Sequence, residues 1–527
     1  MIFRSALPDV AIPSIPLTTL LLEAAAKRPG KPAFIDGVSG RILTFGDWAA
    51  AVRRGAFGLS AHGFGKGDVL AIYSPNCPEY AVAFNAVALA GGATTTINPT
   101  YTVEELTAQL RDCRARYLLT VPALLDKARA AAASAGVAET FVLGQAPGAV
   151  AFSELLDAEG PLPDVAIDPR TDVAALPYSS GTTGLPKGVM LTHHNLVANM
   201  CQMRGAMPIL GEDDVFVGVL PFFHIYGLMV IMNLGLFLGA TTVILPRFDL
   251  ETFLETLQRY GVTFAHVVPP IALALAKHPS VDKYDLSRMR TLFSGAAPLG
   301  EAVTRACAER LGCVVMQGYG LTETSPGTHV APCDPDRIKA GAVGPPIPNT
   351  ECKVLDLITG KPLGPGDLGE ICMRGPQIMK GYLGRPQATA DMIDVEGWLH
   401  SGDIGYAEAD GYLHVVDRVK ELIKYKGLQV APAEIEAVLL SHPAVADAAV
   451  VPSPDAEAGE VPKAFLVLKG EASLEEILAY VAARVAPHKR LRRVEVIGQI
   501  PKSLSGKILR RILAQQEREG ATAPPAN

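Results

Sequence analysis

A stretch rich in serine, threonine and glycine is the part of this chain best suited to hold phosphate. It reads YSSGTTGLPKG over residues 178–188, so seven of its eleven residues are Ser, Thr or Gly, and Lys187 stands near its end. Glycine lets the backbone approach a ligand closely, N–H and hydroxyl groups surround phosphate oxygens, and a lysine adds charge. The alternative is a flexible linker. Because apolar runs flank the stretch at residues 173–176 and 189–191, we favour a phosphate-binding loop.

The spacing of this loop does not match the nucleotide P-loop, in which Lys directly follows the last Gly and precedes Ser or Thr. Here Leu185 and Pro186 separate Gly184 from Lys187, and Gly188 follows. A P-loop kinase or GTPase is therefore not expected.

Four other side chains are candidates for chemistry, and each has a structural alternative. Glu323 could hold Mg²⁺ beside a phosphate loop, or it could complete a helix cap. Asp403, in SGDIG, could accept both hydrogen bonds of a ribose diol, or it could be a turn residue. His224 could line an apolar pocket or be a satisfied core histidine. Lys507, in a Ser-Gly turn, could bring charge to the site or be solvated.

The elements that must position these residues are α/β layers. Strands alternate with helices from about residue 16 to residue 324, which indicates parallel sheets covered by helices. Polar, Gly-rich loops follow strands at residues 178–188, 294–300 and 317–324, where α/β proteins bind ligands. The predicted fold is a large N-terminal domain (1–419) of layered α/β sheets with a β-rich subdomain at about 341–416. A small mobile α+β C-terminal domain (421–527) would follow a hinge at residue 420.

Composition narrows the class of protein. The length of 527 residues predicts two or more domains, and a net charge of −7 argues against nucleic-acid binding. The eight cysteines show no zinc spacing and read as reduced thiols of a cytoplasmic protein. No signal peptide or peroxisomal tripeptide is evident. The apolar run 225–245 is interpreted as a buried helix, a turn near Gly239 and a strand, rather than a membrane span.

Five motifs, in order, resemble the adenylate-forming superfamily of acyl-CoA synthetases, luciferases and peptide-synthetase adenylation domains. They are YSSGTTGLPKGV, QGYGLTET, SGDIGY, VDRVKELIKYKG and PKSLSGK, and the resemblance covers about residues 20–515. The segments PFFHIYG and KYKGLQVAP are most similar to 4-coumarate:CoA ligases, and the composition resembles bacterial members. The resemblance implies that a carboxylate attacks the α-phosphate of Mg·ATP to give acyl-AMP and pyrophosphate. Coenzyme A then gives the thioester and AMP.

The resemblance also implies roles for individual residues. Lys507 would stabilise the adenylation transition state and Glu323 would hold Mg²⁺, while Asp403 and Arg418 would hold the ribose. The phosphates and the rest of the nucleotide would contact Ser179, Ser180, Gly181, Thr182, Thr183, Gly184, Lys187, Thr322, Gly295, Ala296, Ala297, Pro298, Gln317, Gly318 and Tyr319.

The remaining roles concern the acid and coenzyme A. His224 would gate or orient the carboxylate, and the acyl pocket would include Tyr226, Gly295, Gly320, Pro326 and Gly327. For the second step the C-terminal domain would turn about Lys420 and bring in Lys424, Gln429 and the coenzyme A contacts Lys426 and Gly427, with Arg247 as a further contact. The basic run 488–493 could receive coenzyme A or be solvated.

The acid itself stays open at this stage. Gly327 stands where plant coumarate ligases carry an aliphatic residue, so a cinnamate or a medium-chain fatty acid could fit. The partners expected are a carboxylic acid, ATP and coenzyme A, with monomer or homodimer undecided. The alternatives are a stand-alone enzyme that loads a carrier protein, a luciferase-type oxygenase and a non-catalytic sensor. Retention of Glu323, Asp403 and Lys507 together argues against the sensor.

Overall fold

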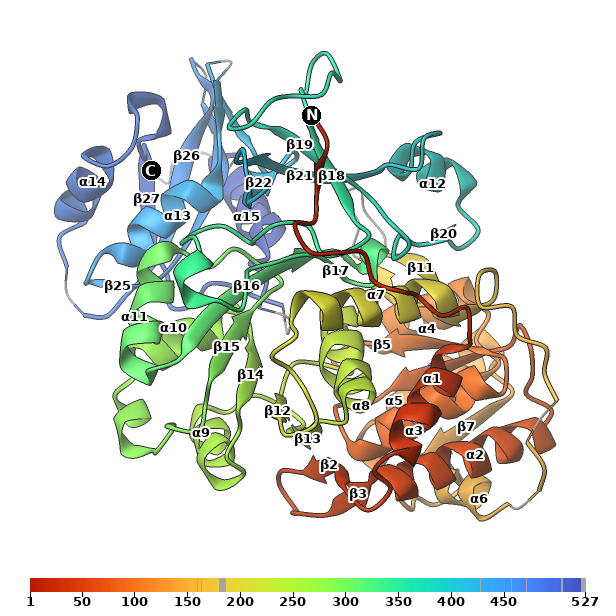
Figure 1. The fold of residues 1–527 in the computed structure, drawn as a ribbon. Helices are drawn as coiled ribbons and strands as arrows, with labels where there is room; N and C mark the ends of the chain where they lie inside the picture. The colour runs from red at the N-terminus through yellow and green to blue at the C-terminus, as the bar shows by residue number, and fades with distance from the viewer. Residues whose placement is uncertain are drawn as a thin grey trace.

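Four sheets and their covering helices make up the computed structural model, which describes residues 1–158, 160–162, 164–179, 186–426, 428–455, 457–470, 472–503 and 506–522. The two largest sheets form the body of the molecule, a third sheet lies beyond them, and the C-terminal module sits beside the third sheet (Figure 1). The helices are α1 (Leu17–Ala26), α2 (Phe45–Ala61), α3 (Pro78–Leu89), α4 (Val103–Asp112), α5 (Leu125–Ala135), α6 (Phe152–Asp157), α7 (His193–Ala206), α8 (Leu234–Leu238), α9 (Leu250–Arg259), α10 (Pro269–Lys277), α11 (Glu301–Leu311), α12 (Pro386–Met392), α13 (Pro432–Ser441), α14 (Leu474–Ala482) and α15 (Arg510–Thr522).

Both large sheets are parallel in their centres, as the alternation of strands and helices predicts. In spatial order the first contains β10 (Tyr178–Ser179), β11 (Lys187–Thr192), β9 (Val173–Ala175), β5 (Ala93–Ile97), β4 (Val69–Tyr73), β6 (Tyr117–Thr120), β7 (Glu139–Val142) and β8 (Val150–Ala151), with β20 (Gly381–Tyr382) paired to β11. The second contains β17 (Gly327–Val330), β16 (Val314–Gly320), β15 (Thr291–Ser294), β14 (Phe264–Val267), β12 (Val215–Gly218), β13 (Thr241–Ile244), β2 (Pro32–Asp36) and β3 (Ile42–Thr44).

The two smaller sheets follow in the chain. The third contains β1 (Phe3–Arg4), β18 (Glu351–Leu355), β19 (Gly369–Arg374), β21 (Leu399–Ala407) and β22 (Leu413–Arg418). The fourth contains β24 (Leu428–Val430), β23 (Ile423–Tyr425), β26 (Gly459–Leu468), β25 (Val445–Asp455) and β27 (Arg493–Val496). It has a hydrophobic core of its own that includes Ile435, Val450 and Leu466. The predicted fold class is therefore confirmed.

Short sequence motifs cap the first turns of two helices. Thr44 caps α2. Its hydroxyl accepts a hydrogen bond from the Asp47 N–H, and the Asp47 carboxylate accepts one from the Thr44 N–H. This capping box satisfies N–H groups that a helix start leaves unpaired. Thr102 and Glu105 form the same arrangement at α4.

The apolar run near residue 225 folds as the sequence predicts. A π-helix, η2 (Tyr226–Asn233), continues into α8, which ends at Gly239 with φ of +79° before β13 begins. All of η2 is buried. No helix within the described ranges has the length and apolarity needed to cross a membrane.

Two very short strands join sheets whose other strands lie far away in the chain. β1 pairs with β18, so Phe3 lies opposite Cys352 in the third sheet. β20 lies in the chain between β19 and β21 of the third sheet, but it pairs with β11 of the first sheet, where Tyr382 lies opposite Val189. Each strand has only two residues, too few for a periodic signal. The second pairing matters for the site because β11 also carries Lys187.

Candidate active site

The base of the Ser/Thr/Gly-rich loop is a short antiparallel hairpin. Ser179 at the end of β10 lies opposite Lys187 at the start of β11, so the two ends of the loop are held together. The predicted phosphate contacts Ser180, Gly181, Thr182, Thr183 and Gly184 lie outside the described residues.

Glu323 is anchored directly to this hairpin. It lies in a single 3₁₀ turn, Thr322–Thr324, and is 5% exposed. Its Oε1 accepts hydrogen bonds from the Ser179 hydroxyl at 2.8 Å and from the Tyr382 hydroxyl at 2.7 Å. The Lys187 Nζ lies 4.9 Å from the centroid of the Tyr382 ring. A buried carboxylate, hydroxyl groups and a lysine are thus gathered at the mouth of the loop, a donor set that fits Mg²⁺ with phosphate oxygens.

Tyr382 is a member of this group that sequence reasoning missed. Burial, and next the charge of Glu323, raise the pKa of its phenol above the usual value, so the hydroxyl keeps its proton and donates to the carboxylate. Nothing in the local sequence marks it, because its role depends on the pairing of β20 with β11.

A second cluster surrounds Asp403. Asp403 and Arg418 are opposite each other on β21 and β22. The Arg418 Nε donates to the Asp403 Oδ1 at 3.1 Å, and the Tyr319 hydroxyl donates to Oδ2 at 2.7 Å. Asp403 is 5% exposed, and burial raises the pKa of its carboxyl although Arg418 and Tyr319 oppose that effect. The structure therefore brings together Asp403, Arg418 and Tyr319, three residues predicted to bind nucleotide.

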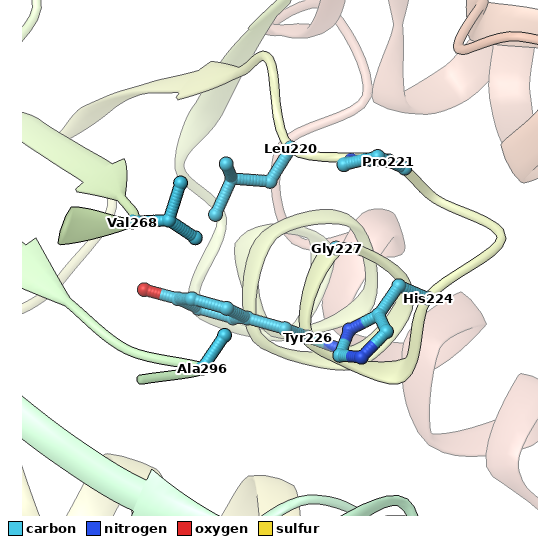
Figure 2. A pocket seen from close by; sticks show the side chains of 7 residues that line it. All are labelled: Leu220, Pro221, His224, Tyr226, Gly227, Val268 and Ala296. Atoms are coloured by element: carbon cyan, nitrogen blue, oxygen red, sulfur yellow. The ribbon is translucent and has the colours of Figure 1, made fainter. Parts of the chain in front are cut away.

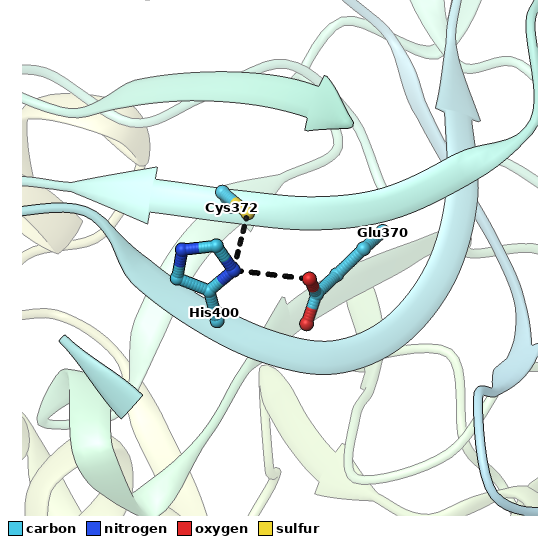
Figure 3. Close-up of side chains that lie close together, drawn as sticks. All are labelled: Glu370, Cys372 and His400. Atoms are coloured by element: carbon cyan, nitrogen blue, oxygen red, sulfur yellow. Dashed lines mark hydrogen bonds and ion pairs between the residues drawn. The ribbon is translucent and has the colours of Figure 1, made fainter. Parts of the chain in front are cut away.

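The turn that carries Asp403 is supported from the neighbouring strand. The Gly402 N–H donates to the Glu370 Oε1 at 3.1 Å, and the Glu370 Oε2 lies 3.0 Å from the His400 Nδ1 (Figure 3). The other ring nitrogen of His400 lies 3.6 Å from Asp394. The hydrogen bond to Glu370, opposed by partial burial, raises the pKa of His400. His400, which lies between two carboxylates, thus holds Glu370 in place, and Glu370 holds the backbone beside Asp403.

Cys372 lies next to the same histidine, at 3.5 Å from its Nδ1 (Figure 3). The potential ligand atoms of Glu370, Cys372 and His400 are all within 4.8 Å of one another. However, burial and the nearby Glu370 raise the pKa of the thiol, and metals bind the thiolate. Both nitrogens of His400 also face carboxylates. We therefore interpret the cluster as a support for the Asp403 turn.

Lys507 reaches this site from the C-terminal module. The preceding Gly506 has φ of +78°, and a Cβ there would lie 2.9 Å from Val268 Cγ2, so only glycine allows this close approach. Burial, and next the charge of Arg418, lower the pKa of Lys507, while Asp403 and Glu323 oppose them. One lysine therefore interacts with both the Glu323 and the Asp403 clusters, which come from other sheets.

A small apolar cavity is lined by His224 and Tyr226 (Figure 2) and by Val268, the residue that Gly506 approaches. Its volume is about 10 Å³, and its lining also includes Leu220, Pro221, Gly227, Val268 and Ala296. The Tyr226 hydroxyl donates to the Phe293 carbonyl at 3.1 Å. A Cβ on Gly295 would lie 3.0 Å from the Tyr226 ring, so this glycine provides the space that the ring fills.

His224 is neutral in this setting. Burial, with a smaller contribution from Lys507, lowers the pKa of its imidazole to about 3. Its Nδ1 accepts a hydrogen bond from the Tyr226 N–H at 3.3 Å, which places the ring proton on Nε2. His224 can therefore donate a hydrogen bond from Nε2 without adding charge.

The two loops predicted to border the nucleotide are tied to each other. The Gln317 side-chain carbonyl accepts from the Leu299 N–H at 3.0 Å, which links the 295–300 loop to β16. A Cβ on Gly318 would lie 2.5 Å from Phe293, so β16 packs directly on that ring. Ala296 has φ of +70°, a conformation that non-glycine residues rarely adopt. Ala297 is half-buried and Pro298 is exposed, while Thr322 opens the turn of Glu323.

The space left by Gly327 is already filled. A Cβ there would lie 2.7 Å from the Met203 Sδ. The Asn199 side chain binds both backbone groups of Gly327, accepting from its N–H at 3.1 Å and donating to its carbonyl at 2.8 Å. Gly320 is fixed as well, because a Cβ there would lie 1.8 Å from the Pro326 carbonyl oxygen. The absence of an aliphatic side chain at residue 327 therefore does not leave a void.

The residues predicted to serve the second step form a separate group. Lys424 and Gln429 are opposite each other on the β23–β24 hairpin, with exposed side chains. Lys426 forms an ion pair with Glu457 of the same module, and Gly427 lies outside the described residues. Arg247 is exposed just before α9, and Lys420 is exposed between β22 and β23.

The basic run 488–493 is largely paired within its own module. Lys489 binds Glu434 at 2.7 and 2.8 Å, and Arg493 contacts Glu517 and Asp455. These ion pairs favour a structural role for the two residues.

The fold and the loop set define an adenylate-forming enzyme. The solved structures with this fold include an anthranilate CoA ligase in complex with anthranoyl-AMP (26% identity, TM-score 0.89, covering 97% of this chain and 98% of that one). They also include ATP-bound MatB from Rhodopseudomonas palustris (30% identity, TM-score 0.87, covering 96% of this chain and 99% of that one).

Sequence comparison leads to the family. The model of the AMP-binding enzyme matches residues 21–383, and that of the AMP-binding enzyme C-terminal domain matches residues 434–507. 4-coumarate–CoA ligase 5 of Oryza sativa subsp. japonica is 45% identical over 99% of this chain and 98% of its own length. The 4-coumarate–CoA ligase of Vanilla planifolia is 45% identical over 100% and 98%. The chain belongs to the AMP-binding enzyme family.

The predicted enzyme class, an AMP-forming acid–thiol ligase that uses ATP, Mg²⁺ and coenzyme A, is thereby confirmed. The expected likeness to bacterial members is not borne out, because these relatives are plant enzymes.

Replacing Tyr382 by Phe tests the support of Glu323. The variant removes one hydrogen bond to a charged acceptor, a contribution of about 1.5–3 kcal/mol. We expect the Mg²⁺ concentration for half-maximal pyrophosphate release to rise about tenfold or more. Tyr412→Phe is the matched control, because its hydroxyl donates to the Arg337 carbonyl away from the site. Equal Mg²⁺ dependence in the two variants would contradict the role of Tyr382.

Replacing Gly327 by Val tests the contact with Met203. The new side chain must displace the Met203 thioether, and overpacking of this kind costs about 1–3 kcal/mol. We expect a lower thermal unfolding temperature, partly restored by adding Met203→Ala. A double-mutant cycle measures the coupling. Additive effects of the two substitutions would show that the side chains do not share this space.

Proposed function

We propose that the protein activates 4-coumarate and related hydroxycinnamates. The carboxylate oxygen bonds to the α-phosphorus of ATP and pyrophosphate leaves. The thiol of coenzyme A then loses its proton, its sulfur bonds to the acyl carbon, and AMP leaves. The observation that carries the proposal is the electrostatic interaction of Lys507 with both Glu323 and Asp403, together with the apolar cavity that His224 and Tyr226 line. The substrate follows from the names of relatives that match along the whole chain.

In the first step Lys507 is the main source of positive charge at the reacting phosphorus. Phosphoryl and nucleotidyl transfers depend on positioning and electrostatic stabilisation, and a partly desolvated ammonium is effective because little water screens it. His224 is neutral, so it orients the carboxylate by a hydrogen bond from Nε2 and leaves its negative charge available for attack.

The nucleotide would be held at both ends. Asp403 and Arg418 would take the ribose, since each Asp403 oxygen keeps a lone pair beyond its present hydrogen bond. Ser179, Lys187 and Thr322 would hold the phosphates together with the loop between the strands. Glu323 would hold Mg²⁺, which neutralises charge on the phosphates when bound.

The second step would require the C-terminal module to turn. The module has its own core, so it can move as a unit, and we place the hinge at Lys420 with the module at residues 421–527. The turn would withdraw Lys507 and bring in the β23–β24 hairpin with Lys424, Gln429 and Lys426, to which coenzyme A would bind with Gly427 and Arg247. The cytoplasmic location expected from the sequence stays a prediction.

Lys507→Ala separates the two steps. We expect pyrophosphate release with 4-coumarate to fall at least a hundredfold, because the variant loses the buried charge that acts on the transition state. Thioester formation from added acyl-AMP and coenzyme A should stay within about threefold of the wild type. Wild-type pyrophosphate release by the variant would contradict the assignment of Lys507.

Lys426→Ala is expected to show the reverse pattern. Adenylation should be nearly unchanged, while the KM for coenzyme A should rise about tenfold, the effect of losing one charged contact. The exposed Lys283, replaced by Ala, controls for a general loss of surface charge. An equal loss in both half-reactions would contradict a separate role in the second step.

A further inference from the structure

A histidine lies behind the cavity among aromatic rings. His266 is on β14, in the middle of the second sheet, and is 0% exposed. Its ring centroid lies 4.8 Å from Phe264, 5.1 Å from Phe216, 5.8 Å from Phe293 and 5.8 Å from Tyr226. Neither the chemistry of the nucleotide nor that of the carboxylate uses this residue.

Both nitrogens of His266 are unsatisfied. Within the described ranges neither of them has a hydrogen-bond partner. Buried polar groups are nearly always paired, and an unpaired one is destabilising unless a ligand completes it. Burial lowers the pKa of the ring to about 3, so the imidazole is neutral near pH 7 and has one N–H donor and one acceptor.

The strand geometry directs His266 toward the acyl site. Val268 follows two residues later in an extended conformation, so the two side chains lie on the same face, about 6.6 Å apart along the strand. Val268 lines the cavity and is the residue that Gly506 approaches. His266 therefore lies farther inside along the same wall.

The Tyr226 ring lines the cavity and stands edge-on to His266 at an interplanar angle of 85°. The cavity of about 10 Å³ has room for roughly one water, so an acyl group enters only if side chains move. Movement of the Tyr226 ring, which lies between the cavity lining and His266, would open the cavity toward His266. The end of the acyl group far from the carboxylate would then contact the aromatic rings around His266 and the polar imidazole of His266 itself.

We propose that His266 is the polar end of the acyl pocket, where its imidazole exchanges a hydrogen bond with a ring hydroxyl of the bound aromatic acid. The inference rests on the proposed function and refines it, because it selects acids with a hydroxyl far from the carboxylate. His266 is a specificity-determining residue in this scheme, and it has no part in the transfer itself.

The test compares 4-coumarate with cinnamate, which lacks the ring hydroxyl. We expect the wild type to prefer 4-coumarate in kcat/KM by about tenfold or more, since a site built for a hydroxyl disfavours the analogue that leaves it unpaired. In His266→Phe the ratio should fall to about one, chiefly through a higher KM for 4-coumarate. His266→Gln keeps a donor and an acceptor and should retain part of the preference.

Phe264→Leu is the matched control, because it loosens the same ring cluster without removing a polar atom. It should change turnover of both acids alike and leave the ratio unchanged. A wild type that does not distinguish the two acids, or a His266→Phe variant with the wild-type ratio, would overturn the inference and leave the proposed function standing. A wild type that forms neither thioester, with ATP, Mg²⁺ and coenzyme A present, would overturn the proposed function and the inference with it. The wild-type comparison is decisive even if the Phe variant fails to fold.

Discussion

The arrangement of the site depends on a lysine that is held partly out of water and attracted by the charges of two carboxylates. Burial disfavours the charge of Lys507, and Asp403 and Glu323 favour it. Since charge is costly to bury without partners, the docked position of the C-terminal module is linked to the presence of both acids. Those acids come from different sheets, so the position of one side chain depends on three parts of the fold.

The second condition is that these acids do not move. Glu323 is fixed by Ser179 and Tyr382, and the backbone beside Asp403 is fixed by Glu370, which His400 holds in turn. The supporting residues lie on strands, and a rigid strand holds a carboxylate more accurately than a loop does. Electrostatic stabilisation of a transition state requires such fixed groups, since reorientation during the reaction would reduce the gain.

The fold class could be predicted from the sequence because its signals are local, and the motifs that carry the candidate nucleotide residues are local as well. Thr44 and Thr102 each cap a helix through a partner three residues further along the chain. Glu323 lies in the turn after β16, and Asp403 lies within β21. Tyr382, Met203 and His266 could not be found in this way. Their roles come from contacts with residues far away in the chain, such as Glu323 and Gly327. The prediction that Gly327 leaves spare volume was wrong for the same reason, because Met203 on α7 fills that space.

The π-helix that begins at Tyr226 has a consequence for how related pockets diverge. Such a helix accommodates an extra residue within an α-helical path and is frequent at functional sites. Loss of one residue from η2 would let it relax to an α-helix and rotate the side chains before it relative to those after it. A single-codon deletion would then replace the residue facing the acid without disturbing α8. Evolution of a new acid specificity can therefore act on the length of η2 as well as on its amino-acid composition.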